Sequence, residues 1–204
     1  MSHIVVIGAG QAGSSLVAKL RKDGFDGEIT LIGAEKALPY QRPPLSKAYL
    51  LGEMELERLF LRPASFYEDN NITLRLGARV SGIDPEAKTV SIGDEVISYD
   101  QLALTTGSDP RRLPAAIGGD LEGVHVVRGL SDVDAMAPSV SEGKRALIVG
   151  GGYIGLEAAA VCAKRGVKVT LVEMADRILQ RVAAPETSDY FRKLHQDHGV
   201  EIRE

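Results

Sequence analysis

The chain has 204 residues, enough for one large domain or two small ones, and 44% of them are hydrophobic, which is ample for a packed core. Its net charge of −4 and its scattered basic residues give no reason to expect a nucleic-acid partner, and its single cysteine excludes an internal disulfide framework. The longest apolar stretch, residues 146–163, contains three consecutive glycines and a glutamate, so we reject a membrane span and expect a cytoplasmic protein.

The first predicted element is a buried strand that turns into a helix through a glycine-rich motif. Residues 4–7 are all β-branched, which indicates a strand buried on both faces. Gly8, Gly10 and Gly13 then follow at the spacing of a dinucleotide fingerprint, before a predicted helix that ends near Asp23. The first glycine permits a tight turn, the second lets a pyrophosphate approach the backbone, and the third lets the helix pack on the strand. The alternative is a tight strand–helix–strand turn that binds no nucleotide.

A second strand is predicted over residues 28–35 and ends at an acid. The carboxylate of Glu35 could accept hydrogen bonds from a ribose at this position. A proline-rich loop follows, and its second half carries two cations, Arg42 and Lys47, which are either surface charges or anion contacts beside the glycine turn. A short helix is predicted at 63–70, and a short strand at 72–74.

Three short strands, predicted at 78–84, 89–92 and 95–98, are separated by turn residues and indicate an antiparallel meander. An apolar strand then ends abruptly in Thr105-Thr106-Gly107, an ending that suits close approach of the backbone to a ligand. The Pro- and Gly-rich piece that follows is the best domain boundary, and we expect domains of residues 1–113 and 114–204.

A second fingerprint appears in the predicted second domain. A strand over 144–149 is followed by Gly150, Gly152 and Gly155, by a helix predicted from Leu156 to about Arg165, and by a strand over 167–172. Glu173 closes that strand 23 positions after the first of these glycines, near the roughly 20 expected for a ribose-binding acid. The sequence therefore predicts an α/β fold with two dinucleotide-binding units.

The motifs resemble those of a known flavoprotein family. Two such units joined through a Thr-Thr-Gly strand resemble the two-dinucleotide flavoproteins that include glutathione reductase, which have Rossmann-like domains. Residues 38–47, Leu-Pro-Tyr-Gln-Arg-Pro-Pro-Leu-Ser-Lys, together with 150–157, Gly-Gly-Gly-Tyr-Ile-Gly-Leu-Glu, are similar to a narrower group, the NADH-dependent ferredoxin and rubredoxin reductases. That group continues for about as much chain again, so the chain looks like its N-terminal half, with an incomplete second domain.

The resemblance implies FAD in the first site and NADH in the second. Because the family often has an acid at position 34, where this chain has alanine, Glu35 is assigned to the adenosine ribose. The implied FAD contacts are Gly8, Gly10, Ala12, Gly13, Ala34, Glu35, Arg42, Lys47, Val80, Thr106, Gly107 and Arg128. The implied NADH contacts are Gly150, Gly152, Tyr153, Ile154, Gly155, Glu157 and Glu173.

The resemblance also implies a reaction, in which a hydride passes from NADH to FAD and single electrons pass to a ferredoxin-type iron–sulfur protein that supplies a cytochrome P450 or dioxygenase. Lys47 and Glu157 are the candidate catalytic residues, as a charged pair near the flavin; the alternative is that Lys47 contacts phosphate and Glu157 caps its helix. Glu173 should repel a 2′-phosphate and favour NADH over NADPH, although two arginines, Arg177 and Arg181, lie nearby in the sequence.

Other classes of protein remain as alternatives. Disulfide reductases and NADH oxidases of the same superfamily need cysteines soon after the first unit, whereas the only thiol here, Cys162, is predicted inside the second helix as a small buried residue. A shortened chain that only binds a nucleotide or a partner is the second alternative.

His195 and His198 could share a helix face, but no third ligand lies near them in the sequence, so we expect no metal site. Arg111 and Arg112 are either a docking contact for an acidic ferredoxin or a solvated pair.

Overall fold

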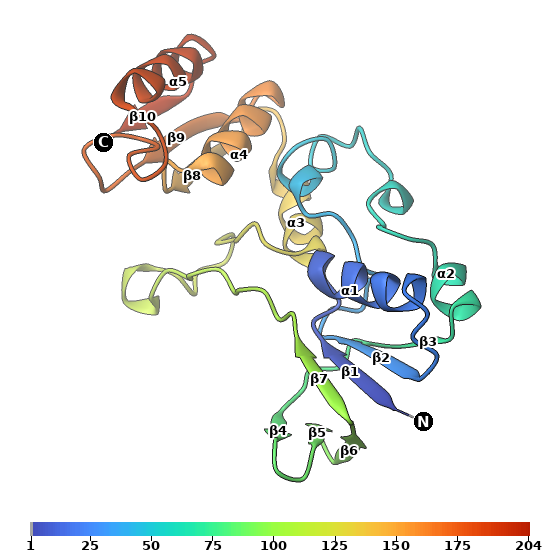
Figure 1. The fold of residues 1–204 in the computed structure, drawn as a ribbon. Helices are drawn as coiled ribbons and strands as arrows, with labels where there is room; N and C mark the ends of the chain where they lie inside the picture. The colour runs from blue at the N-terminus through green and yellow to red at the C-terminus, as the bar shows by residue number, and fades with distance from the viewer. Residues whose placement is uncertain (1) are drawn as a thin grey trace. The chain divides into compact units, whose positions relative to one another are not determined.

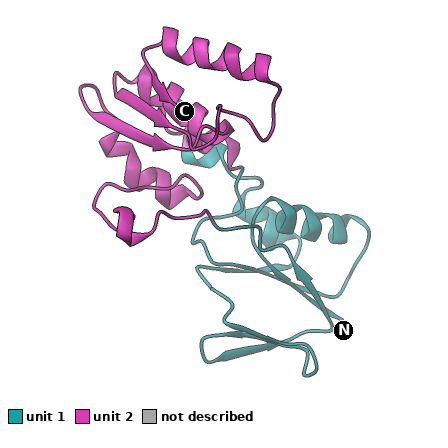
Figure 2. Ribbon diagram, turned by 90° about the vertical axis from the view of Figure 1, so that its left-hand side faces the viewer, with its two compact units in different colours: residues 1–41, 56–109 teal, residues 42–55, 110–204 magenta. Residues whose placement is uncertain are grey.

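The computed structural model describes residues 2–204, and they form two compact units, drawn in different colours in Figure 2. The first unit extends to Gln41 and resumes over Leu56–Asp109, and the second consists of Arg42–Glu55 and Pro110–Glu204. The loop from Arg42 to Glu55 therefore belongs to the second unit although the sequence places it inside the first. The chain passes between the units after Asp109, and the assignment of cofactor domains to 1–113 and 114–204 stays a prediction.

The first unit is built on a four-stranded parallel sheet with the order β3-β2-β1-β7. Its strands are β1 (His3–Ile7), β2 (Glu28–Gly33), β3 (Ile72–Leu76) and β7 (Gln101–Leu104). The helices α1 (Gln11–Lys22) and α2 (Ala64–Asp69) pack on one face, as Figure 1 shows for α1 above the blue strands. The predicted first strand, first helix and short strand after residue 71 are confirmed.

Both faces of this sheet are covered, which explains the unbroken apolar run of the first strand. Ile4 and Val6 pack with Val17 of α1 in one core cluster, whereas Val5 and Ile7 pack with Val90 in another. Val90 belongs to the antiparallel meander, which consists of β4 (Gly82–Asp84), β5 (Thr89–Ile92) and β6 (Glu95–Ser98). The predicted meander is therefore confirmed, and it covers the face opposite to the helices.

The second unit is built on a three-stranded parallel sheet with the order β10-β9-β8. Its strands are β8 (Arg145–Val149), β9 (Lys168–Val172) and β10 (Glu201–Arg203), and its helices are α3 (Leu130–Met136), α4 (Tyr153–Lys164) and α5 (Pro185–Asp197). The inward residues Val169 and Leu171 are buried with Leu156 and Ala159 of α4, whereas Leu147 on the opposite face is 67% exposed.

The loop from Arg42 to Glu55 is attached to this unit by its side chains and backbone. Leu45 and Leu50 are each 1% exposed, and the 3₁₀ turn Pro43–Ser46 contacts α3 and α4. The guanidinium of Arg165 donates to the carbonyl of Leu50 at 2.8 Å, and the hydroxyl of Tyr49 donates to a carboxylate of α3 at 2.8 Å. These bonds join the loop to α3 and to the C-terminal end of α4.

Three predicted boundaries were wrong. Helix α4 begins at Tyr153 rather than at Leu156, because the extended backbone of Gly152 (φ −81°, ψ −178°) is its N-cap. The strand expected at 78–84 is reduced to Gly82–Asp84, because the N–H of Ala78 donates to the carbonyl of Gly33, at the end of β2, and not to the meander. His198 lies beyond the end of α5, at its C-cap.

Among residues 2–204, no helix has the length and apolarity needed to cross a membrane.

Candidate nucleotide-binding sites

The first glycine turn joins β1 to α1 and leaves an open space at its centre. Gly8 has φ +115°, its N–H donates to the carbonyl of Ile32 at 2.8 Å, and a Cβ added there would lie 2.1 Å from the carbonyl oxygen of Thr105. A Cβ on Gly13 would lie 2.0 Å from the carbonyl oxygen of Gly8, whereas one on Gly10 would meet nothing within 4 Å. Packing of the protein therefore requires glycine at the first and third positions. At the second position no protein atom requires it, so the requirement would come from a ligand in the adjacent space.

The second glycine turn, between β8 and α4, repeats this geometry. Gly150 has φ +110° and donates to the carbonyl of Val172 at 2.8 Å, and a Cβ on Gly155 would lie 2.0 Å from the carbonyl oxygen of Gly150. A Cβ on Gly152 would again meet nothing within 4 Å. Neither α1 nor α4 carries an acidic residue in its first turn, so the positive end of each helix is left for an anion. Both turns fit a pyrophosphate.

The structure gathers several predicted residues around the first turn. The hydroxyl of Thr105 donates to the carbonyl of Gly8 at 2.8 Å, which places the exposed Thr106 and Gly107 next to that turn. Ala12 is exposed in the first turn of α1. Thr105 itself was missed as a site residue, although the sequence identified the strand ending that contains it.

The acid at the end of the second strand lies on the same edge of the sheet. A Cβ on Gly33 would lie 2.6 Å from the Cβ of Ala9, so the exposed Ala34 and the half-buried Glu35 follow directly beside the glycine turn. The carboxylate of Glu35 accepts a hydrogen bond from the hydroxyl of Tyr40 at 2.5 Å. Val80 is half-buried against the core cluster that contains Ile7 and Ile32, and its contact with FAD stays a prediction.

Glu173 is tied to the second glycine turn by hydrogen bonds to the backbone. Its Oε1 accepts from the N–H of Ala175 at 2.9 Å and its Oε2 from the N–H of Gly151 at 2.7 Å. These two hydrogen bonds, of which the first is the stronger influence, hold the pKa of Glu173 below its ordinary value against the opposing effect of burial. Tyr153 and Ile154, each 56% exposed, lie at the start of α4 beside the same turn. The predicted second-site residues are therefore brought together.

Gly151 is a contact residue that the fingerprint does not require and that sequence reasoning missed. A Cβ at this position would lie 2.6 Å from Cγ2 of Ile178, and the N–H of Leu179 donates to the carbonyl of Gly151 at 2.9 Å. The loop after Glu173 therefore packs directly on the glycine turn. Three consecutive glycines, where the fingerprint needs only the outer two, were the available signal.

Lys47 and Glu157 form an ion pair inside the second unit, with 2.8 Å between Nζ and Oε2. The hydroxyl of Ser46, which is 5% exposed, donates to the same oxygen at 2.7 Å, and Nζ also donates to the carbonyl of Pro43 at 3.2 Å. No side-chain hydrogen bond caps α4, so Glu157 does not act as its cap. Ser46 was not identified as part of this cluster from the sequence.

Arg42 and Arg128 also meet in the second unit. Nη1 of Arg42 donates to the carbonyl of Arg128 at 2.6 Å, and the N–H of Arg128 and that of Gly129 donate to Oδ2 of Asp132 at 3.2 and 2.7 Å. This arrangement fixes the backbone at the start of α3. Arg42, Lys47 and Arg128, which the resemblance assigned to FAD, thus all belong to the second unit.

Comparison with known sequences identifies the family. The profile of the family described as "Pyridine nucleotide-disulphide oxidoreductase" matches residues 2–204. The chain belongs to this family.

Members that resemble this chain include named ferredoxin reductases. A ferredoxin–NAD(P)(+) reductase of Sphingomonas sp is 46% identical over 201 residues, covering 98% of this chain and 48% of that protein. Putidaredoxin reductase CamA of Pseudomonas putida is 39% identical over 204 residues, covering 98% and 48%. The resemblance to ferredoxin reductases is therefore confirmed, and the chain spans about half the length of the curated relatives it matches.

Solved structures agree with this assignment. The reductase in the covalent putidaredoxin reductase–putidaredoxin complex superposes with a TM-score of 0.95 at 39% identity, covering 99% of this chain and 49% of that one. The water-forming NADH oxidase of Lactobacillus brevis gives a TM-score of 0.90 at 25% identity, covering 100% of this chain and 46% of that one. The predicted α/β fold with two Rossmann-like units is confirmed.

The family's name refers to a disulphide, which needs two cysteines, and this sequence has one. Cys162 is the sole cysteine of the sequence, lies in α4 and is buried, and this burial raises the pKa of its thiol. A buried thiol that stays protonated is a poor nucleophile.

His195 is also buried, and its ring nitrogens lie 2.8 and 3.1 Å from the carbonyl oxygens of Phe191 and Leu156. Within residues 2–204, no three His, Cys, Asp or Glu side chains are grouped to hold a metal ion.

Proposed function

We propose that this chain supplies the nucleotide-binding part of an NADH-dependent, FAD-containing ferredoxin reductase. The observation that carries the proposal is the pair of glycine turns of matching geometry, each with an open central position at the N-terminus of a helix. The named ferredoxin reductases among the relatives, and the reductase solved together with putidaredoxin, support a ferredoxin-type iron–sulfur protein as the partner. A cytoplasmic location, where NADH is available, belongs to the same proposal.

The first turn fits the pyrophosphate of FAD. The backbone N–H groups at the start of α1 would receive the phosphates beside Gly10, and Glu35, next to the turn, would accept from the adenosine ribose. Thr106 and Gly107, exposed at the end of β7, present backbone to the same edge of the sheet. Bound FAD would supply the chemistry that converts a two-electron hydride donor into a source of single electrons.

The second turn fits NADH. The N–H groups at the start of α4 would receive its pyrophosphate beside Gly152, and Tyr153 and Ile154 present exposed side chains there. Glu173 remains ionised because two N–H groups stabilise its charge, so it can accept hydrogen bonds from a 2′-hydroxyl and repel a 2′-phosphate. This charge is the basis for preferring NADH over NADPH.

Lys47 and Glu157 are the residues we assign to the reacting end of the nucleotides. The carboxylate of Glu157 forms an ion pair with the ammonium of Lys47 at 2.8 Å, and the hydroxyl of Ser46 orients that carboxylate. A lysine held in this way supplies a positioned donor and a local positive charge without acting as a nucleophile. The chain's contribution is then binding, orientation and electrostatics.

The visible spectrum of the purified chain tests the proposal. We expect yellow protein with bound FAD, or protein that becomes yellow on incubation with FAD, and bleaching by NADH under anaerobic conditions that is faster than with NADPH. A Gly10→Ala variant should lose the yellow colour while keeping its fold, because the added Cβ meets no protein atom within 4 Å. Failure of the wild-type chain to bind either nucleotide would refute the proposal.

Two other functions are distinguished by further measurements. A module that binds nucleotide without catalysis would bind NADH without bleaching. An NADH oxidase, suggested by the structural similarity to the enzyme of Lactobacillus brevis, would consume oxygen at the rate of NADH oxidation. A ferredoxin reductase should instead reduce an added [2Fe–2S] ferredoxin faster than oxygen.

A further inference from the structure

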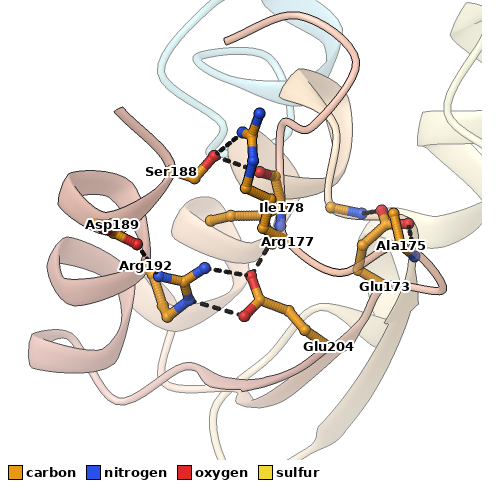
Figure 3. Close-up of polar contacts among 9 residues, drawn as sticks. Glu173, Ala175, Arg177, Ile178, Ser188, Asp189, Arg192 and Glu204 are labelled. Atoms are coloured by element: carbon orange, nitrogen blue, oxygen red, sulfur yellow. Dashed lines mark hydrogen bonds and ion pairs between the residues drawn. The ribbon is translucent and has the colours of Figure 1, made fainter. Parts of the chain in front are cut away.

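The loop that follows Glu173 is anchored at its middle by two side chains from other elements. Ile178 is 0% exposed; its N–H donates to Oε1 of Glu204 at 2.8 Å, and its carbonyl accepts from the hydroxyl of Ser188 at 2.6 Å. Glu204 is itself held by Arg192, with bonds of 2.9 and 2.8 Å. Figure 3 shows both anchors around the labelled Ile178. Each of the two backbone polar groups of this buried residue thus has a side-chain partner.

The same serine hydroxyl also binds the only arginine between Glu173 and Ile178. Nη1 of Arg177 donates to Oγ of Ser188 at 2.5 Å, and Nη2 donates to the carbonyl of Gln180 at 3.4 Å. In Figure 3 the Arg177 side chain extends toward Ser188, away from the carboxylate of Glu173. A hydroxyl has one proton to donate and lone pairs to accept, so a single orientation of Ser188 satisfies both the carbonyl of Ile178 and the guanidinium.

The position of the Arg177 guanidinium bears on the choice between NADH and NADPH. A 2′-phosphate on the adenosine ribose would lie next to the acid that ends β9, and a nearby arginine is the group that accommodates such a phosphate in dinucleotide sites. Arg177 follows that acid by four residues, but its guanidinium is already bound to α5. We propose that Ser188 is a specificity-determining positioning residue of the second nucleotide site, and that it keeps Arg177 away from a 2′-phosphate.

The proposal rests on the assignment of the second site to NADH and adds a second mechanism of selection. Glu173 repels the 2′-phosphate directly, and Ser188 withholds Arg177, one of the two arginines of this loop. Because Ser188 is 0% exposed and lies 15 positions after Glu173 on a separate helix, it acts only through Arg177 and the loop. Removing its hydroxyl leaves the other anchor, Glu204 with Arg192, in place.

Four variants of the full chain test the proposal by isothermal titration with NADH and with NADPH under anaerobic conditions. In Ser188→Ala the guanidinium loses its principal partner and becomes available, so we expect the ratio of the NADPH to the NADH dissociation constant to fall about three- to fivefold, the range of an exposed ion pair. Arg177→Ala alone should leave the NADPH dissociation constant unchanged, and the double variant should lose the gain. Thr187→Ala, which removes an exposed hydroxyl from the adjacent position of α5, is the matched control.

The outcomes separate this inference from the assignment of the site. An unchanged ratio in Ser188→Ala, a gain that persists in the double variant, or weaker NADPH binding in Arg177→Ala alone would each overturn the role of Ser188 while leaving the NADH site intact. Absence of NADH binding in the wild-type chain would instead refute the proposed function. Thermal unfolding of each variant confirms that its fold is retained, because a general loss of structure would weaken both nucleotides equally and leave the ratio unchanged.

Discussion

The second glycine turn has a packing role at Gly155 and a proposed nucleotide-binding role at Gly152. A matched pair of variants, Gly155→Ala and Gly152→Ala, separates the two roles. A Cβ on Gly155 would lie 2.0 Å from the carbonyl oxygen of Gly150, and Cβ atoms essentially never lie within 3.0 Å of another heavy atom. Helix α4 would therefore have to move by about 1 Å or more, an overpacking that costs about 1–3 kcal/mol. For a chain of this size we expect the unfolding temperature to fall by roughly 2–12 °C.

Gly152→Ala should give the opposite pattern. Its backbone, with φ −81° and ψ −178°, is open to any residue, and the added Cβ meets no protein atom within 4 Å. The substitution removes a glycine N-cap, which destabilises the helix, and it restricts the unfolded chain, which stabilises the folded state. Because these effects oppose each other, the free energy of unfolding should change by less than about 1 kcal/mol. The Cβ would occupy the space assigned to the pyrophosphate, and NADH binding should weaken by about tenfold or more.

Differential scanning calorimetry and isothermal titration with NADH measure the two effects on the same samples. The reasoning fails if Gly152→Ala binds NADH as the wild type does, since the open position would then not face the nucleotide. It also fails if Gly155→Ala is as stable as the wild type, since the close approach of helix and turn would then not be needed.

Three further predictions concern the carboxylates and the loop of the second unit. Because hydrogen bonds from Ala175 and Gly151 lower the pKa of Glu173, the stability it contributes is present above the ordinary carboxyl pKa and is lost as the pH falls through the lowered one. The difference in unfolding temperature between wild type and Glu173→Gln should therefore be constant above about pH 5 and shrink below it, and a constant difference down to about pH 3 would contradict this. Glu157→Gln should slow reduction of bound FAD by NADH by about tenfold or more, measured by stopped-flow absorbance, with little change in stability because the pair with Lys47 is partly exposed. Arg165→Ala removes a charged hydrogen bond to the carbonyl of Leu50, worth about 1.5–3 kcal/mol, so limited proteolysis should cut the loop from Arg42 to Glu55 faster than in the wild type. The exposed Lys168→Ala is the control, and equal cutting in both variants would argue against the anchor.

Local patterns in the sequence were sufficient to predict most of the fold. The β-branched run before Gly8 specified a strand buried on both faces, and the structure covers one face with α1 and the other with the meander. The turn residues around β5 and β6 fixed the bounds of these two strands, whereas the first strand of the meander was predicted to begin four residues too early. The three glycines of each fingerprint specified both the turn and the helix that follows, although the start of α4 was placed three residues late. These features depend on neighbours within about ten residues.

The features that sequence reasoning missed depend on contacts between distant residues. Ser46 binds Glu157 across 111 positions, and Arg165 binds Leu50 across 115, so no local pattern could reveal that the loop carrying Lys47 packs with the second unit. Gly151 differs from the other glycines because Ile178, on the loop after β9, packs against it. A serine such as Ser188 in the middle of an amphipathic helix has no sequence signal until the arginine and carbonyl it binds are known.

The two glycine turns share their backbone geometry but are stabilised by different neighbours, and this difference has a functional consequence. In the first unit the turn packs against the end of β7 through Thr105, and Glu35 is held separately by Tyr40. In the second unit nothing lies within 4 Å of a Cβ on Gly150, and the acid Glu173 is itself part of the turn through the N–H of Gly151. Replacing Glu35 should therefore affect one ribose contact, whereas replacing Glu173 should disturb both the ribose contact and the phosphate cradle.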